Sequence, residues 1–202
     1  MVLNGVQTFG PQLAATLRTH QRRVGRHWAV DEVCCFRGKQ KLYLYRAGDE
    51  HGQVIDVLRR DRRDRARAEA FFRQALARTD VTPTAVMTDP HQPYVKAAAV
   101  VIPFARHVRT GLHRRRGYTT QPVERSHVPT RDRLRSTPGL STLGAGQRFV
   151  ESFEALHALR RGTVTLRLLV PTYRPTRSSE HEKVRVVVAA LAVVGTQLRE
   201  AA

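Results

Sequence analysis

Three acidic residues stand in sequence contexts that suit metal-dependent chemistry. Asp31 lies within an apolar run, Asp89 directly follows one, and Glu124 comes after a further 34 residues. Carboxylate oxygens are hard ligands that Mg²⁺ prefers, and a few suffice because Mg²⁺ keeps several waters. Two ions about 3.5–4 Å apart stabilise the attacking and leaving oxygens of a phosphodiester. In such a site Asp31 would bridge two Mg²⁺ ions, which Mn²⁺ could replace, and Asp89 and Glu124 would bind one each; an acid in a basic chain is otherwise more often a surface ion-pair partner.

The charge of the chain favours a polyanionic partner. It carries 35 Lys+Arg against 17 Asp+Glu, a formal net charge of +18. Such an excess attracts nucleic acid. Only four of the basic residues are lysines. Arginine suits bidentate phosphate contact, but codon bias in a GC-rich genome explains the ratio equally well.

An arginine-rich stretch, residues 106–135, brackets Glu124. It contains nine arginines and two acids. We expect it to contact a DNA backbone; the alternative is a solvated charged loop. His127 could orient a phosphate or a metal-bound water, or could be structural. The candidate DNA-binding residues are Arg109, His113, Arg114, Arg115, Arg116, His127, Arg131, Arg133 and Arg135.

The elements that must position the acids follow from hydrophobic periodicity. Strand-like runs joined by short turns predict an antiparallel meander, and helical crossovers between the later strands make those strands parallel. The sequence therefore predicts an α/β fold with a mixed five-stranded sheet, flanked by helices, with extra C-terminal helices. The expected strands are 28–36, 42–45, 54–58, 84–88 and 102–107, and the expected helices between them are 64–78 and 93–101.

In such a sheet the first and fourth strands are neighbours, so the carboxylates of Asp31 and Asp89 can converge. Glu124 must come from a later element. Glu32 lies on the opposite strand face from Asp31, so its carboxylate should point away from the site. Trp28 is expected in the core, although it could instead stack on an exposed base.

The remaining features indicate the cellular compartment of the protein. Cys34 and Cys35 are adjacent, so they point to opposite faces of a strand and are expected to be reduced, as in a cytosolic protein. The N-terminus lacks the pattern of a signal peptide. The apolar run 186–195 is too short to span a bilayer. We expect a cytoplasmic, nucleoid-associated protein that binds neither a membrane nor a small-molecule substrate.

Several motifs in order resemble the DDE transposases of the insertion-sequence-six family, which have a ribonuclease-H-like fold. The resemblance covers residues 7–162, with Pro90 in place of a usual lysine and Thr120-Gln121 in place of paired asparagines. Family features also recur in Asp61-Arg62-Arg63-Asp64, in Phe71-Phe72-Arg73 and in Tyr94. The motifs that carry it are His27-Trp28-Ala29-Val30-Asp31-Glu32-Val33, Tyr43-Leu44-Tyr45-Arg46-Ala47, Thr88-Asp89 and Glu124-Arg125-Ser126-His127.

The resemblance implies metal-dependent DNA cleavage and strand transfer during transposition, with Asp31, Asp89 and Glu124 as the catalytic acids. The implied partners are transposon ends, target DNA and further copies of the chain assembled on DNA. We expect residues 1–26 to be a remnant after a missing helix-turn-helix, 27–162 a catalytic domain, and 163–202 a linker and C-terminal helix.

Two other interpretations stay open. One is a truncated, non-autonomous remnant that binds DNA or full-length transposase without productive transposition. The other is a general basic RNA- or DNA-binding protein, which would explain the charge but not the ordered acidic motifs.

Overall fold

The computed structural model describes residues 2–37, 39–109, 128–134, 137, 140 and 142–164, with isolated positions between 185 and 200. The chain divides into two compact units. One is Val24–Gln147, and the other combines Met1–Arg23 with Arg148–Ala202.

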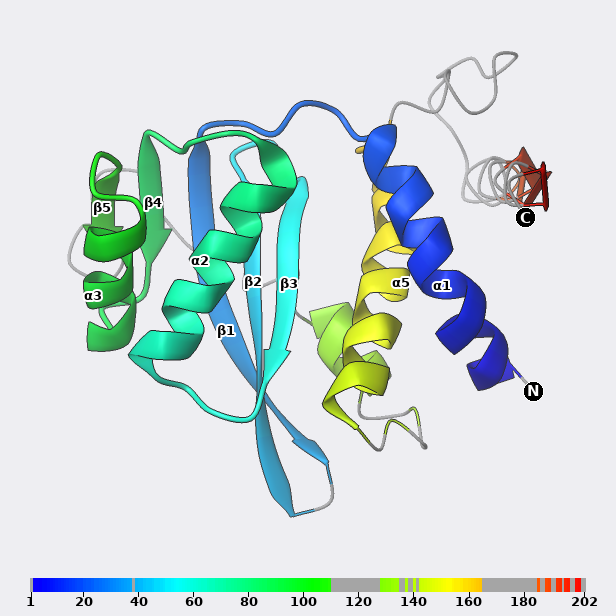
Figure 1. Cartoon of the computed structure of the whole chain (residues 1–202), viewed down its shortest axis with the longest axis horizontal. Coiled ribbons are helices and arrows are strands. Elements are labelled where there is room, and N and C mark those ends of the chain that lie inside the picture. The colour runs from blue at the N-terminus through cyan, green and yellow to red at the C-terminus, as the bar shows by residue number, and fades with distance from the viewer. Residues whose placement is uncertain are drawn as a thin grey trace. The chain divides into compact units, whose positions relative to one another are not determined.

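The first unit is built on a five-stranded sheet with the order β3-β2-β1-β4-β5 (Figure 1). β1, β2 and β3 form an antiparallel meander, whereas β4 pairs in parallel with both β1 and β5. This confirms the predicted mixed sheet and the adjacency of the first and fourth strands. The strands are β1 (His27–Arg37), β2 (Gln40–Asp49), β3 (Val54–Arg60), β4 (Ala85–Thr88) and β5 (Arg106–Arg109).

β1 and β2 run well beyond their neighbours. β3 pairs with β2 only from Tyr43 to Gly48, and β4 pairs with β1 only from His27 to Ala29. The end of the β1–β2 hairpin is therefore a two-stranded ribbon that projects from the sheet (Figure 1).

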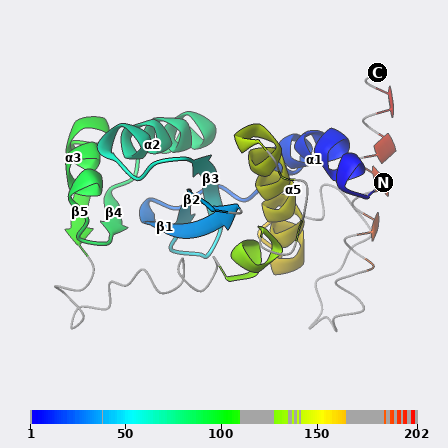
Figure 2. The same cartoon turned by 90° about the horizontal axis from the view of Figure 1, so that it is seen from below.

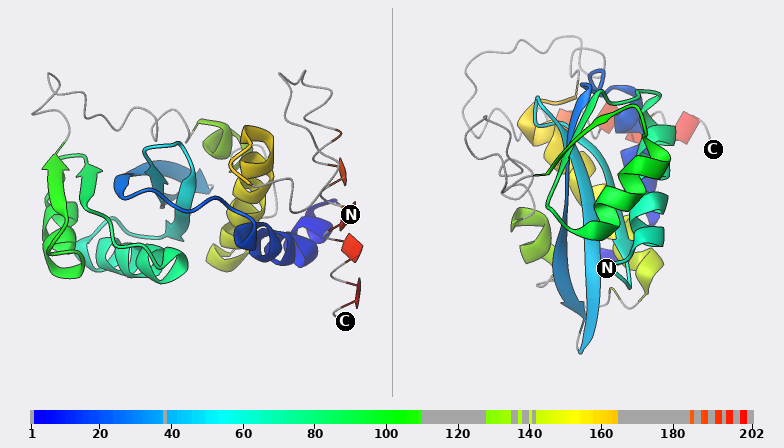
Figure 3. Two further views of the ribbon diagram at one scale, coloured as in Figure 1. Left: turned by 90° about the horizontal axis from the view of Figure 1, so that it is seen from above. Right: turned by 90° about the vertical axis from the view of Figure 1, so that its left-hand side faces the viewer.

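Two helices, α2 (Arg65–Thr79) and α3 (Gln92–Val101), cover one face of the sheet (Figures 2 and 3). α2 begins after Asp64, whose carboxylate accepts a hydrogen bond from the Arg67 N–H at 2.9 Å. This N-cap satisfies one of the donors that a helix start leaves unpaired. The helix ends at Asp80 in the left-handed conformation, with φ of 50°. The two caps fix where the chain enters and leaves the helix.

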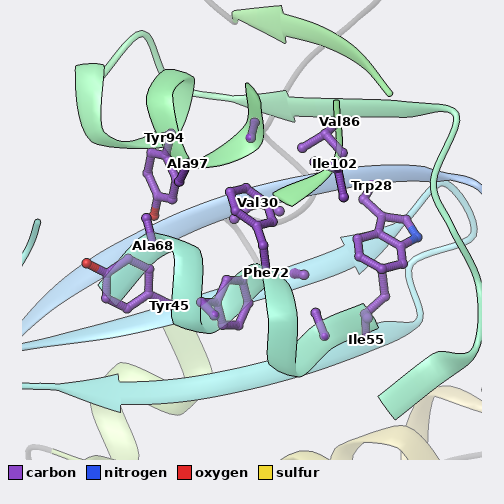
Figure 4. Close-up of a cluster of buried hydrophobic side chains, with 14 of the residues drawn as sticks. Trp28, Val30, Tyr45, Ile55, Ala68, Phe72, Val86, Tyr94, Ala97 and Ile102 are labelled. Atoms are coloured by element: carbon purple, nitrogen blue, oxygen red, sulfur yellow. The ribbon is translucent and has the colours of Figure 1, made fainter. Parts of the chain in front are cut away.

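The main core lies between these helices and the sheet (Figure 4). Trp28, Val30 and Tyr45 face α2 and α3 from the strands and are at most 1% exposed. Phe72 and Tyr94 meet edge to face, with ring centroids 6.3 Å apart. Burial of each large side chain contributes about 1.5–3 kcal/mol. Trp28 is thus a core residue, as predicted, and its indole donates to the Gly25 carbonyl at 2.9 Å.

The fifth strand lies later in the chain than predicted. The sequence suggested residues 102–107, but β5 is Arg106–Arg109. Ile102 is instead the C-cap residue of α3, and its backbone N–H donates to the Ala98 carbonyl at 2.9 Å. The chain then turns, and the Ala105 N–H donates to the Ile102 carbonyl at 3.0 Å. Pro103 lies in this turn. The buried, apolar Ile102 therefore belongs to the end of α3 and not to a strand.

In the other unit, α1 (Val2–Thr19) packs against the C-terminal part of α5 (Leu143–Arg161) (Figure 1). Their contact is a small apolar cluster that includes Ala14, Leu17 and Leu159. Most of the predicted C-terminal helix lies outside the described residues. Among the residues that the structure describes, no helix is both long and apolar enough to cross a membrane.

Candidate active site

Asp31 lies in the middle of β1, directly opposite Arg46 of β2 in the antiparallel register. Residues that oppose each other in such a pair project to the same face of the sheet. Arg46 is 1% exposed, whereas Asp31 is half-buried. A buried guanidinium and a carboxylate that solvent can reach therefore lie side by side on this face, away from the α2–α3 core.

Asp89 follows the last residue of β4. The parallel pairing of β1 and β4 aligns Ala29 with Met87, two residues before Asp31 and Asp89 in their segments. The two aspartates thus come from equivalent points of adjacent chain segments. Ala29, Met87 and Val108 form a small buried cluster on the face that Asp31 shares.

Both carboxylate oxygens of Asp89 are hydrogen-bonded. Oδ2 accepts from Nη2 of Arg63 at 2.9 Å, and Oδ1 accepts from the backbone N–H of His91 at 3.1 Å. The Asp89 side chain is 34% exposed. The carboxylate is therefore oriented from two sides and still open to solvent.

The neighbouring acid Glu32 differs from expectation. Its side chain is 5% exposed and, as the alternation predicts, faces the helix side of the sheet. However, it is ion-paired with Nε of Arg63, the same guanidinium that binds Asp89. The prediction that Glu32 points away from the site is therefore incomplete, because the long arginine side chain joins the two acids.

Burial raises the pKa of Glu32 to about 7. The Tyr94 hydroxyl and the Arg63 guanidinium lower this pKa, whereas the negative charges of Asp89 and Asp31 raise it. The pKa of Tyr94 is raised because its hydroxyl is buried beside Glu32. Burial also lowers the pKa of His91, helped by the charge of Arg63 and opposed by Asp89.

The structure describes only part of the predicted site. Glu124 lies outside the described residues, as do His113, Arg114, Arg115, Arg116, His127 and Arg135. Within the part of the chain that is described, no three His, Cys, Asp or Glu side chains gather as a metal cluster. The two described acids, Asp31 and Asp89, supply the hard oxygen donors that suit a divalent cation such as Mg²⁺.

Three of the predicted DNA-binding arginines are described. Arg109, exposed at the end of β5, is in register with Thr88, the residue before Asp89. It therefore ends its strand beside Asp89's segment. Residues 128–134 are helical, and there Arg131 lies 3.7 Å from the exposed Asp132 carboxylate while Arg133 is exposed.

No role was predicted for Arg46 or Arg63, although both lie in segments that carry the family resemblance. Arg63 is one of several arginines close together at the end of β3, and nothing in composition distinguishes it from exposed Arg62 beside it. Arg46 carries a clearer signal, because it interrupts the run Leu42–Gly48, which is otherwise uncharged, and a charged residue requires a partner when it is buried.

The two cysteines are free, as predicted: Cys34 is half-buried and Cys35 is buried.

Comparison with known proteins places the chain in a family. The model of the DDE domain of IS240-type transposases matches residues 25–163. The transposase for insertion sequence-like element IS431mec of Staphylococcus aureus is 25% identical over 166 residues, which are 82% of this chain and 73% of the relative. The transposase for insertion sequence element IS257 in transposon Tn4003, also from S. aureus, shows the same identity and coverage.

Solved structures of retroviral integrases are also similar. The HTLV-2 integrase catalytic core domain in complex with magnesium matches with a TM-score of 0.48 and 17% identity, over 78% of this chain and 95% of that one. A chain of the simian T-cell lymphotropic virus intasome in complex with PP2A regulatory subunit B56 gamma matches with a TM-score of 0.49 and 13% identity. That match covers 83% of this chain but only 56% of the viral chain. By the family match over residues 25–163, the chain belongs to the DDE domain family of transposases.

Proposed function

We propose that Asp31, Asp89 and Glu124 bind the catalytic metal of a site that cuts and joins DNA strands. The observation that carries this proposal is the parallel register of β1 and β4, in which Ala29 aligns with Met87 two residues before each aspartate. Glu124 is included in the proposed site because of the motif resemblance, in which its motif follows the other two in the family's order.

The family membership gives the reaction class. A DDE transposase is a polynucleotidyl transferase that cleaves DNA and transfers the strand during transposition, with a divalent metal. In each step the oxygen of water or of a 3′ hydroxyl loses a proton and forms a bond to phosphorus, the existing phosphorus–oxygen bond breaks, and the departing oxygen takes up a proton.

The metal would be held by carboxylate oxygens, and the donor set fits Mg²⁺. When bound, two ions would polarise the phosphoryl group and stabilise the attacking and leaving oxygens. The chain itself supplies the anchors: β1 fixes Asp31 by its pairing with β2, and the His91 N–H and Arg63 orient Asp89. We propose two Mg²⁺ ions, with Mn²⁺ as a functional substitute.

We further propose that residues 27–162 form the catalytic domain and that the basic stretch around Glu124 carries the DNA. Arg109 supports this path, because it ends β5 next to the segment that carries Asp89 and is exposed to solvent. DNA at this edge would bring its phosphates to the acids. We expect several copies of the chain to assemble on transposon ends and target DNA.

The decisive experiment compares Asp31→Asn with the wild-type chain of residues 1–202. Supercoiled plasmid reports nicking, and a labelled oligonucleotide with a free 3′ hydroxyl reports joining, each with Mg²⁺ or Mn²⁺. Asp31→Asn should abolish both activities, because the amide is not an anionic ligand, and should leave the circular dichroism spectrum unchanged. EDTA should have the same effect on the wild type.

Asp80→Asn is the matched control. Asp80 is exposed at the left-handed end of α2, a conformation that asparagine also adopts. It removes one carboxylate of the same kind and should keep full activity. Cleavage that persists in Asp31→Asn, or in EDTA, would contradict the assignment. DNA binding without any cleavage by the wild type would favour the non-autonomous remnant instead.

A further inference from the structure

The guanidinium of Arg63 is shared between two carboxylates that strand alternation would separate. Its Nε is ion-paired with Oε1 of Glu32, and its Nη2 donates to Oδ2 of Asp89 at 2.9 Å. The planar guanidinium presents donors in a fixed fork, so one side chain can hold two acceptors at a defined spacing. The position of Asp89 is thereby linked to that of Glu32.

The backbone around Arg63 is held on both sides. The Tyr45 hydroxyl donates to the carbonyl of Arg62 at 3.3 Å, and Asp64 caps the start of α2. Arg63 therefore lies in a short link between two anchored residues, after β3 and before α2. Its side chain, 32% exposed, extends from a fixed point.

Of the two carboxylates that Arg63 joins, Glu32 is anchored more firmly than Asp89. Glu32 belongs to β1 and is 5% exposed, while the Asp89 side chain is 34% exposed and follows the end of its strand. Tyr94, 1% exposed in α3, lies against Glu32. A buried carboxylate requires a charged or hydrogen-bonding partner, and Arg63 supplies it. The buried Glu32 therefore holds the Arg63 guanidinium in place, and the guanidinium in turn orients the Asp89 carboxylate.

We propose that Arg63, held by Glu32, is a positioning residue that orients the Asp89 carboxylate for metal binding. This inference rests on the proposed function of Asp89. Each carboxylate oxygen can accept two hydrogen bonds or ligand contacts, so the contacts from Arg63 and His91 leave lone pairs for a cation. Partners that hydrogen-bond a metal-binding carboxylate fix its orientation, and their loss typically costs about 10–100-fold in metal affinity or activity.

The test measures Mn²⁺ binding to the full chain by electron paramagnetic resonance, together with the Mn²⁺ concentration that half-saturates DNA nicking. In Arg63→Gln, both the dissociation constant and the half-saturating concentration should rise about 10–100-fold. Arg63→Lys should not restore wild-type affinity, because an ammonium group lacks the fork that holds both acids. Arg65→Gln is the matched control: it removes an arginine two residues away that pairs with Glu69, and Mn²⁺ affinity should be unchanged.

Glu32 variants test the chain of contacts and guard against misfolding of Arg63→Gln. Glu32→Gln keeps an oxygen acceptor for Nε of Arg63, so its affinity loss should be smaller than that of Glu32→Ala. Equal losses in the two variants would contradict the role of Glu32. A purely structural ion pair would lower the melting temperature but leave the half-saturating Mn²⁺ concentration of the folded protein unchanged, and this result would overturn the proposal.

Tighter Mn²⁺ binding in Arg63→Gln would also overturn it, because Arg63 would then be a competitor of the metal. Asp31→Asn separates this inference from the proposed function. If Asp31→Asn binds Mn²⁺ as the wild type does, the metal lies elsewhere and both ideas fail. If Asp31→Asn loses Mn²⁺ while Arg63→Gln retains it, only the positioning role fails.

Discussion

The side-chain amide of Gln147 accepts a hydrogen bond from the backbone N–H of Arg59 at 2.7 Å. Its Nε2 donates in turn to the Val57 carbonyl at 2.8 Å. β3 is an edge strand, whose outward N–H and C=O groups would otherwise be a template for pairing with another chain. Gln147 thus pairs with β3 as a neighbouring strand would.

Loss of this amide should destabilise the fold. Gln147→Leu leaves two backbone groups without their partner, which costs about 1–3 kcal/mol for a buried group. Gln147→Glu keeps the acceptor for Arg59 but not the donor for Val57, so its loss should be smaller. Urea unfolding measures both, with Gln12→Glu, exposed on α1, as the control. Equal midpoints for all four proteins would show that the edge needs no such partner.

Close helix packing in the unit of α1 and α5 should depend on Gly10. A Cβ at this position would lie 1.9 Å from Oγ and 2.6 Å from Cβ of Ser152. Gly10→Ala should therefore lower the melting temperature, since overpacking costs about 1–3 kcal/mol and exceeds the gain of about 1 kcal/mol in helix propensity.

Two further variants test the cause of that effect. Gly10→Ala combined with Ser152→Gly should recover part of the lost melting temperature, because the clashing atoms are removed. Gly195→Ala places a Cβ that, beyond its own helix, meets no atom of the described residues within 4 Å, so it should not destabilise. A Gly10→Ala protein that melts as the wild type does would contradict the close packing.

Stability should fall on acidification through His107. Its ring nitrogen Nε2 lies 2.9 Å from the Thr88 hydroxyl, and burial, then the charge of Arg109, lowers its pKa. Because the unfolded chain then binds a proton at higher pH than the folded one, stability is present above about pH 6.5 and is lost as pH falls through the folded pKa.

Urea midpoints from pH 8 to pH 5 measure this effect. His107→Gln should flatten part of the decline, whereas His51→Gln, at an exposed turn, should leave the decline intact. If the urea midpoint of His107→Gln falls with pH as much as that of the wild type does, other groups cause the pH dependence.

DNA affinity should depend steeply on salt through the arginine-rich stretch. Each phosphate neutralised on duplex DNA contributes about 0.9 to the slope of log K against log salt concentration. Replacing Arg114, Arg115 and Arg116 by alanine should therefore reduce the slope by as much as about 3 units if all three contact phosphates. Fluorescence anisotropy with random duplex gives the slope.

The matching control replaces three arginines near α2, Arg62, Arg65 and Arg73, all exposed, and removes the same charge. An equal change of slope in both triple variants would indicate diffuse attraction by net charge, and an unchanged slope in the first would place the DNA path elsewhere.

The sequence predicted the parts of the fold in which local pattern and burial agree. The strand-like runs and short turns predicted β1 to β3, and the caps at Asp64 and Asp80 enclose the helix predicted over residues 64–78. β5 was misplaced because only Val108 of its four residues is buried, so its hydrophobic signal is weak, while Ile102 mimics a strand residue next to it.

The candidate site was predictable only at the level of backbone position. Strand adjacency brings the segments that carry Asp31 and Asp89 side by side, and that follows from element order. The link from Glu32 to Asp89 does not, because it depends on the direction of the long Arg63 side chain, and strand alternation carries no information on a side chain that reaches from another element.

The projecting end of the β1–β2 hairpin sets the dynamics of the sheet. Near its turn, Cys35 and Phe36 pair only with Leu42 and Lys41, and Phe36 is 56% exposed. Among the described residues no third strand pairs with this ribbon, so we expect its backbone amides to exchange with deuterium through local opening. The amides near Trp28 lie between β2 and β4, and we expect them to exchange more slowly. We therefore expect β1 to divide into a slowly and a rapidly exchanging part, with Asp31 between them, just after the last residue that pairs with β4.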